Sequence, residues 1–178
     1  MFTDGRSKRV VFLAHCLLNQ NSISDGTAVH PAAFKEIIQV FLDAEVGIVQ
    51  LPCPELCCLG LDRGDEKGAE RPVVMENTRI RAQMQQPEPR RKLMALADYT
   101  MLQILEYHKH GFEILGIVGA NRSPNCGVDT TSMRDEEVAG KGEFMAELTR
   151  RLEAIGLEVP MVGIKGSDDL LSKMRALL

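Results

Sequence analysis

Four short apolar runs, each followed by a segment with helical signals, constrain the fold of this 178-residue chain most strongly. Three of the runs are rich in β-branched residues, a pattern typical of strands buried on both faces of a parallel sheet. The runs occupy residues 9–14, 46–51, 113–119 and 160–164, and the helical segments occupy residues 31–44, 88–110, 142–154 and 168–177. This alternation predicts an α/β fold, a three-layer sandwich with a mainly parallel sheet and helices on both faces.

The length favours a single domain that spans residues 1–178. With 44% hydrophobic residues, the chain is long enough for one buried core and short for two. Residues 59–88 belong to a stretch rich in glycine, proline and charge, and we expect them to form a long binding or lid loop. A second polar loop is expected between the turn at Cys126 and residue 141.

Composition limits the partners of the chain. A net charge of -4 without a dense basic stripe, together with 4% aromatic residues, argues against extended nucleic acid. The apolar run near the N-terminus, residues 10–14, is too short for a signal sequence or a membrane span. We therefore expect a cytoplasmic protein without a membrane partner, in which five cysteines serve as free thiols, metal ligands or catalysts rather than disulfides. The sequence does not fix the oligomeric state.

Cys16, Cys53 and Cys126 each follow the end of a predicted strand. In an open parallel sheet the carboxyl ends of the strands border the ligand-binding crevice, so these thiols are expected to converge. Thiolates suit iron–sulfur clusters, zinc or Cu(I), but neither the paired spacing of a structural zinc site nor the spacing of a ferredoxin is present. A three-thiolate cluster site is the interpretation that we favour. The alternative is that all three are small buried apolar side chains.

Cys57 and Cys58 follow Cys53 by about one helical turn. Either thiol could supply a fourth ligand or receive a transferred sulfur. We prefer the simpler interpretation that both pack beneath the neighbouring leucines.

Glu55 and Ser123 are the candidate catalytic residues. Glu55 lies two residues after Cys53, where a carboxylate could exchange a proton with a ligand bound at the sulfur, or stabilise a helix N-terminus. Ser123 lies three residues before Cys126 in a turn that contains proline and glycine. Its hydroxyl could bond a substrate, a cluster sulfur or a backbone amide.

Four further residues are candidate substrate contacts: His15, Asn19, Asn21 and Arg63. His15 could relay protons near neutral pH, although an isolated histidine at a strand end is more often structural. The amides of Asn19 and Asn21 suit the edge of a heterocycle, and Arg63 could clamp a phosphate or carboxylate. Each of these side chains could equally serve its own loop.

Three sequence blocks form a recognisable combination: Ala14-His15-Cys16-Leu17-Leu18, then Cys53-Pro54-Glu55 with Leu59-Gly60-Leu61 and Arg63, and Ser123-Pro124-Asn125-Cys126-Gly127. Together they resemble the thiouracil desulfidase (TudS) family, and within it a TudS-related desulfidase branch. The resemblance implies a [4Fe-4S] cluster held by Cys16, Cys53 and Cys126, with one iron open toward the sulfur of a thiocarbonyl substrate. It also implies acid–base work for Glu55, a polar catalytic role for Ser123, and release of hydrogen sulfide without net redox change.

The chain departs from the better-known members of that family at residues that would line the pocket. It has Asn19-Gln20-Asn21-Ser22 where they have Gly and a Tyr-Arg-x-Asp-Gly stretch, Leu59-Gly60 instead of a glycine pair, and Asn125 where serine is usual. The implied substrate is therefore a small thiolated molecule, such as a thiolated base, nucleoside or other thioamide, rather than thiouracil itself.

Two other functions stay open at the level of sequence. One is a hydrolase or transferase with a cysteine nucleophile, Cys16 or Cys53, assisted by His15. The other is an α/β protein that binds a metal or metabolite without catalysis.

Overall fold

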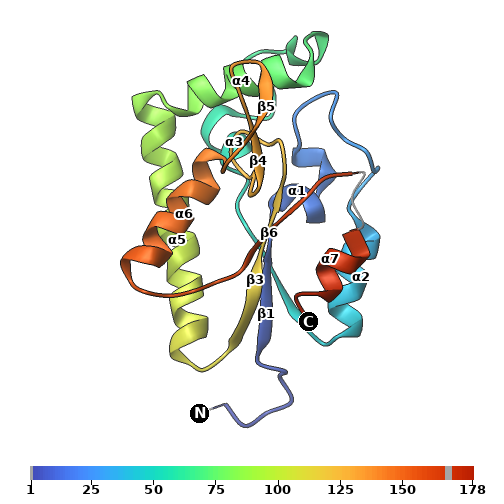
Figure 1. Ribbon diagram of the computed structural model, residues 1–178, viewed down its shortest axis with the longest axis vertical. Helices are drawn as coiled ribbons and strands as arrows, with labels where there is room; N and C mark the ends of the chain where they lie inside the picture. Colours follow the sequence, from blue (N-terminus) through green and yellow to red (C-terminus); the bar gives the residue numbers. More distant parts are fainter. Residues whose placement is uncertain (1, 167–169) are drawn as a thin grey trace.

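The computed structural model describes residues 2–166 and 170–178, and its centre is a four-stranded parallel sheet (Figure 1). The strands lie in the order β2-β1-β3-β6, with β1 (Arg9–Leu13), β2 (Gly47–Gln50), β3 (Glu113–Ala120) and β6 (Met161–Ile164). All three neighbouring pairs run parallel. β1 is interior to the sheet, which explains why its sequence is apolar without alternation and why it is buried from Val10 onward.

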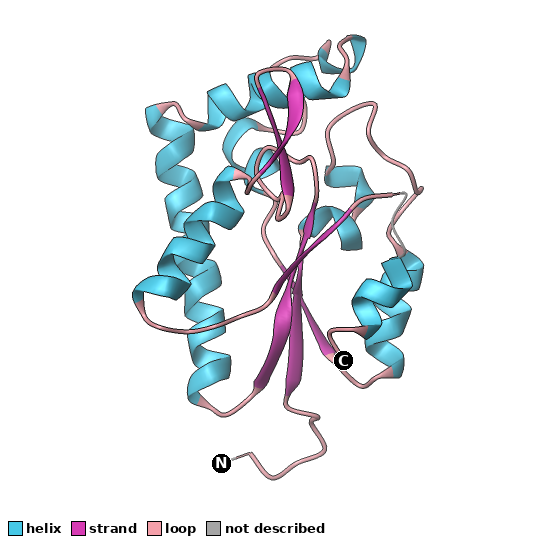
Figure 2. Ribbon diagram, in the orientation of Figure 1, coloured by secondary structure: helices cyan, strands magenta, loops and turns pink. Residues whose placement is uncertain are grey.

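Helices cover both faces of the sheet (Figures 1 and 2). One side carries α5 (Pro87–Lys109) and α6 (Glu143–Ala154), and the other carries α2 (Lys35–Asp43) and α7 (Leu170–Arg175). The predicted α/β architecture is therefore confirmed. The expected start of the last helix, residue 168, lies outside the described residues. Among the helices of the described chain, none combines the length and the hydropathy that a membrane crossing needs.

The core lies between the sheet and these helices. Its largest fully buried side chains come from strands and helices alike, and they include Phe12, Ile37, Phe41, Ile104, Ile117 and Phe144. Burying a side chain of this size stabilises the fold by roughly 1.5–3 kcal/mol. The core thus holds the carboxyl ends of the strands in fixed register, and those ends carry the short helices α1 (His15–Leu18) and α3 (Pro54–Leu59).

The prediction of a long loop over residues 59–88 is wrong for much of its length. It contains the 3-10 helix η2 (Gly68–Glu70), the helix α4 (Val73–Met84) and the first turn of α5. The buried side of α4 includes Glu76 and Asn77 beside Ile80 and Met84, so apolar residues do not recur at helical spacing. Another 3-10 helix, η1 (Gln20–Ser22), follows α1 in a region without recognisable periodicity.

The loop expected before residue 141 is a small antiparallel hairpin of β4 (Thr130–Met133) and β5 (Glu136–Ala139). Its two turn residues, Arg134 and Asp135, both have positive φ angles, 55° and 63°. Two-residue hairpin turns with positive φ angles usually contain asparagine and glycine, and this turn contains neither. The hairpin was therefore not recognisable from the sequence.

Candidate functional site

Three neighbouring strands deliver Cys16, Cys53 and Cys126 to one edge of the sheet. Cys16 lies in α1, directly after β1, and Cys53 is the N-terminal cap of α3, which follows β2. Cys126 lies in the turn after β3. Because β1 lies between β2 and β3, the three thiols come from adjacent positions at the carboxyl edge, as expected for ligands in an open parallel sheet.

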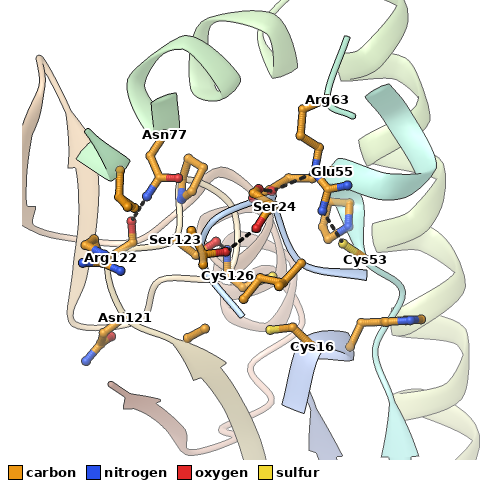
Figure 3. Close-up of a pocket in the computed structure, with 17 residues that line it drawn as sticks. Cys16, Ser24, Cys53, Glu55, Arg63, Asn77, Asn121, Arg122, Ser123 and Cys126 are labelled. Atoms are coloured by element: carbon orange, nitrogen blue, oxygen red, sulfur yellow. Dashed lines mark hydrogen bonds and ion pairs between the residues drawn. The ribbon is translucent and has the colours of Figure 1, made fainter. Parts of the chain in front are cut away.

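The three cysteines line one cavity with a volume of about 110 Å³, which also includes Glu55 and Ser123 (Figure 3). Cys53 and Cys126 are buried, and Cys16 is partly buried. All five cysteines of the chain are free thiols. The residues that the sequence analysis combined into one site are therefore neighbours in space, although up to 110 positions separate them in the chain.

Electrostatics keeps these thiols neutral when nothing compensates their charge. The pKa of Cys16 is raised to about 12 and that of Cys53 to about 11, in both cases chiefly by burial and to a smaller extent by the nearby Glu55 carboxylate. The pKa of Cys126 also lies well above its usual value, first because of burial and then because of charge on the other two thiols. A cysteine nucleophile requires a lowered pKa. The direction of these shifts favours a bound cation, which would compensate the thiolate charge, over a hydrolase or transferase with a cysteine nucleophile.

The turn that carries Cys126 is held by Ser123. The Ser123 Oγ atom accepts hydrogen bonds from the backbone N–H groups of Asn125 and Cys126, at 3.2 and 3.0 Å. These two bonds occupy the acceptor positions of the hydroxyl, so its own hydrogen is directed elsewhere. Ser123 also lines the cavity, and among the described residues no acceptor takes this hydrogen. The hydroxyl is thus placed to donate into the cavity.

The path of the Cys126 turn depends on two closely packed glycines, Gly119 and Gly127. A methyl group on Gly119, near the end of β3, would overlap the carbonyl oxygen of Cys126. A methyl group on Gly127 would overlap the carbonyl oxygen of Thr130. The turn can therefore fold back against β3 only because both positions lack a side chain.

Glu55 is buried and its carboxylate accepts three hydrogen bonds. Arg63 Nε and Ser24 Oγ donate to Oε2 at 3.2 and 3.1 Å, and Asn125 Nδ2 donates to Oε1 at 3.1 Å. A carboxylate offers about four lone-pair sites, so one remains for a further donor. The three donors come from segments that follow three different strands, and they fix the orientation of the carboxylate at the cavity wall.

Arg63 is 2% exposed and its guanidinium is fully engaged. Besides the Glu55 carboxylate, it donates to four acceptors, which are the carbonyl oxygens of Ser22, Gly60 and Leu61 and the sulfur of Cys53. A guanidinium has five N–H groups, and here each of the five has an acceptor. Arg63 lines the cavity, but it can donate to a substrate only by giving up one of these bonds.

The remaining predicted substrate contacts divide into two groups. His15 lines the cavity, and burial lowers the pKa of its imidazole, partly offset by a backbone hydrogen bond at Leu51. Asn19 Oδ1 accepts hydrogen bonds from the backbone and the side chain of Asn21. Asn21 lines a neighbouring hollow together with Asp25 and Asp62, rather than the cavity of the cysteines. The structure brings His15 to the site and leaves the two asparagines outside it.

Cys57 and Cys58 lie on α3 but do not line the cavity. Cys58 is 7% exposed and belongs to the hydrophobic core, which agrees with the preferred interpretation. Cys57 is exposed, so the interpretation of core packing is wrong for this residue.

Sequence reasoning did not find Ser24, Asn77 or Arg122, which also line the cavity, or the contact of Asn125 with Glu55. Asn77 Nδ2 donates to the carbonyl oxygen of Arg122 and to Ser132 Oγ. Asn125 is fully buried, and its Oδ1 atom has no hydrogen-bond partner among the described residues. Only tertiary contacts reveal these roles, apart from Asn125, whose position within the third block was a local signal.

The three thiols match the soft donors that an iron–sulfur cluster requires. Within residues 2–166 and 170–178, no three His, Cys, Asp or Glu side chains are arranged to hold one ion. The thiolate ligands of a four-iron cluster bind separate iron atoms, so they stand farther apart than the ligands of one ion. Three cysteine sulfurs around one cavity, with a buried guanidinium beside them, provide soft donors and a compensating charge.

No protein-family model matches the chain. An uncharacterized protein of Methanocaldococcus jannaschii is 25% identical over 157 residues, which cover 88% of this chain and 86% of that protein. Among solved structures, a [4Fe-4S]-dependent thiouracil desulfidase, TudS, is similar with a TM-score of 0.45 and 15% identity, over 94% of this chain and 96% of that chain.

Proposed function

We propose that this protein is a [4Fe-4S]-dependent desulfidase, formed as one domain by residues 1–178. In the proposed reaction a thiocarbonyl compound and water give the corresponding carbonyl compound and hydrogen sulfide, with no net oxidation or reduction. One observation carries the proposal: Cys16, Cys53 and Cys126 line a single cavity together with Glu55 and Ser123. These five residues also carry the resemblance of the three sequence blocks to thiouracil desulfidases.

Cys16, Cys53 and Cys126 would hold the cluster at three of its corners. When bound, such a cluster supplies a Lewis-acidic iron that favours cleavage of a carbon–sulfur bond. The high pKa values of the free thiols, together with their burial, support a site that is completed by a cationic group. Arg63, beside Cys53, adds a positive charge on the protein side.

Glu55 would act as the general base. Attack of water on the thiocarbonyl carbon releases a proton, and a carboxylate at the cavity wall can accept it. Because Ser24, Arg63 and Asn125 already fix the carboxylate, its remaining lone-pair site has a defined direction. Orientation of this kind removes part of the entropic cost of bringing water and substrate together.

Ser123 would donate a hydrogen bond to the substrate. Its two acceptor positions are filled by backbone N–H groups, so the hydroxyl hydrogen is available in the cavity. Donation to the atom that gains negative charge during attack is a common source of rate enhancement. His15, next to Cys16 in the first block, lines the same cavity and would contact the substrate, and its lowered pKa favours the neutral imidazole.

The substrate would be a small thiolated molecule, such as a thiolated base, a thiolated nucleoside or another thioamide. The Ser24 hydroxyl and the Asn77 amide at the cavity supply polar groups that suit the polar edge of a heterocycle. The aliphatic side chains of Ile23 and Val73 supply apolar surface for its ring.

The test begins with anaerobically prepared protein. Iron and acid-labile sulfide are measured per chain, and the loaded protein is then incubated with 2-thiouracil, 4-thiouracil, 4-thiouridine and thioacetamide. We expect about four iron and four sulfide per chain, as for a cubane cluster, and sulfide release from at least one compound. Glu55→Gln should retain the iron while losing most of the turnover.

Two results would redirect the assignment. A protein free of iron and sulfide after anaerobic reconstitution would contradict the cluster. A stable cluster without sulfide release from any of the compounds would favour a binding protein that is not a catalyst.

A further inference from the structure

Arg63 has an unusual position for an arginine in a connecting segment. It is 2% exposed, its φ angle is 55°, and its side chain reaches back to the N-terminal end of α3. A non-glycine residue rarely adopts this left-handed backbone conformation, and residues that do so cluster at functional sites. The backbone is held in place from α4, because Arg79 Nη2 donates to the Arg63 carbonyl oxygen at 3.0 Å.

The guanidinium joins a candidate cluster ligand to the candidate base. Its Nη2 atom lies 3.9 Å from the Cys53 sulfur, and its Nε atom lies 3.2 Å from Glu55 Oε2 (Figure 3). The backbone N–H of Leu56 also points to the Cys53 sulfur, at 3.5 Å. One rigid, planar side chain therefore sets the separation between the sulfur and the carboxylate.

The charge of Arg63 also acts on all three candidate ligands. The guanidinium interacts electrostatically with the thiols of Cys16, Cys53 and Cys126 from a site that excludes water. Hydrogen bonds to ligand sulfurs and nearby charges are the means by which a protein tunes an iron–sulfur cluster.

We propose that Arg63 is a positioning residue that binds the Cys53 sulfur and the Glu55 carboxylate into one unit, and that it is not a substrate clamp. This inference rests on the proposed function and adds two consequences to it. Arg63 sets the direction in which Glu55 meets water, and it raises the reduction potential of the bound cluster by placing a positive charge beside one ligand. The first consequence follows from the full engagement of its five N–H groups, and the second follows from its charge beside the Cys53 sulfur.

The experiment compares Arg63→Met and Arg63→Lys with the wild type, all reconstituted with cluster under anaerobic conditions. Arg63→Met should lower the reduction potential, because loss of a cation favours the more positive, oxidised cluster. Arg63→Lys should leave the potential near that of the wild type. Both variants should lose kcat, on the order of 100-fold for a displaced base, while KM changes less than about threefold. Turnover is measured with the member of the thiolated panel that gives sulfide.

Arg71→Met is the matched control. Arg71 lies in the same connecting segment and forms ion pairs with Asp65 and Glu76, but it does not line the cavity. This variant should keep both the potential and kcat. A double variant provides an independent test. The kcat of Glu55→Gln combined with Arg63→Met should be only slightly lower than that of Glu55→Gln alone, because Arg63 acts through Glu55.

A rise in KM of more than tenfold with unchanged kcat would overturn the inference, because that result describes a substrate clamp. An unchanged potential in Arg63→Met would overturn the proposed effect on the cluster. If Arg63→Met does not fold, Arg63→Lys decides the question, since unchanged kcat in that variant would refute the positioning role. Failure of the proposed function looks different, because the wild-type protein itself would then lack either the cluster or sulfide release.

Discussion

Ser123→Ala separates two tasks of one hydroxyl, the support of a turn that the structure shows and the donation to substrate that we propose. The Oγ atom accepts the backbone N–H groups of Asn125 and Cys126 at 3.2 and 3.0 Å, and these bonds shape the turn of a candidate ligand. Each such bond contributes roughly 0.5–1.5 kcal/mol, so their joint loss should destabilise the protein by about 1–3 kcal/mol. For a chain of this size the melting temperature should fall by about 2–4 °C per kcal/mol.

The second task is donation into the cavity. Loss of one donor to a developing negative charge typically lowers kcat by about 10²–10³-fold. Ser123→Thr retains the hydroxyl and serves as the matched variant, with a smaller loss of kcat expected. Both variants are measured by anaerobic thermal unfolding and by sulfide release.

Two outcomes would refute this reasoning. An unchanged melting temperature in Ser123→Ala would show that the hydroxyl does not hold the turn. A loss of kcat that is accompanied by a proportional loss of bound iron would show that the serine acts on the ligand turn alone, without contacting the substrate.

Three further predictions concern the ligands, the packing of their turn and the charge pairs of the fold. Each of the variants Cys16→Ala, Cys53→Ala and Cys126→Ala should lose bound iron and labile sulfide, whereas Cys57→Ala and Cys58→Ala should retain both. Full iron in any of the first three variants would contradict the assignment. Gly119→Ala should displace the Cys126 turn, because the added methyl group overlaps the Cys126 carbonyl oxygen, and should lower the free energy of unfolding by about 1–3 kcal/mol. The control in thermal unfolding is Gly5→Ala, whose added methyl group meets no atom within 4 Å. Glu147 is 4% exposed, and its pKa is lowered chiefly by its hydrogen bond with Arg150. Its stabilising effect is therefore complete above the pKa of the unfolded state, about 4.3, and is lost as the pH falls through the lower pKa of the folded state. Glu147→Gln should therefore destabilise the protein at pH 7 by roughly 1–3 kcal/mol, a value limited because Arg150 is exposed while Arg151 is partly buried. Urea unfolding should show that the stability difference between variant and wild type becomes smaller at acid pH, and a constant difference would refute the role of the charge.

The sheet and the convergence of the cysteines were predictable because both depend on local patterns. The runs at Val10–Leu13 and in β3 are apolar without alternation, which indicates interior parallel strands. Once those strands are parallel, the thiols that follow them meet at the same edge. No knowledge of side-chain contacts is needed for this step.

Other features depend on contacts that no local pattern encodes. The helix α4 buries Glu76 and Asn77, so its sequence resembles a polar loop. Arg63 was expected at the substrate, but its acceptors include Ser22, 41 positions away, and its burial follows from that distant contact. The Asn125 contact with Glu55 spans 70 positions. Polar networks of this kind are determined by the assembled fold rather than by the residues beside them.

The sheet order β2-β1-β3 has a consequence for biosynthesis. Cys16, the first candidate ligand, is synthesised long before Cys126, and β3 must pair with β1 before the Cys126 turn can reach the cavity. A growing chain on the ribosome therefore presents isolated thiols until the Cys126 turn has emerged and docked. In the proposed enzyme, the cluster would therefore be completed only after β3 has paired with β1, when most of the polypeptide has already been synthesised.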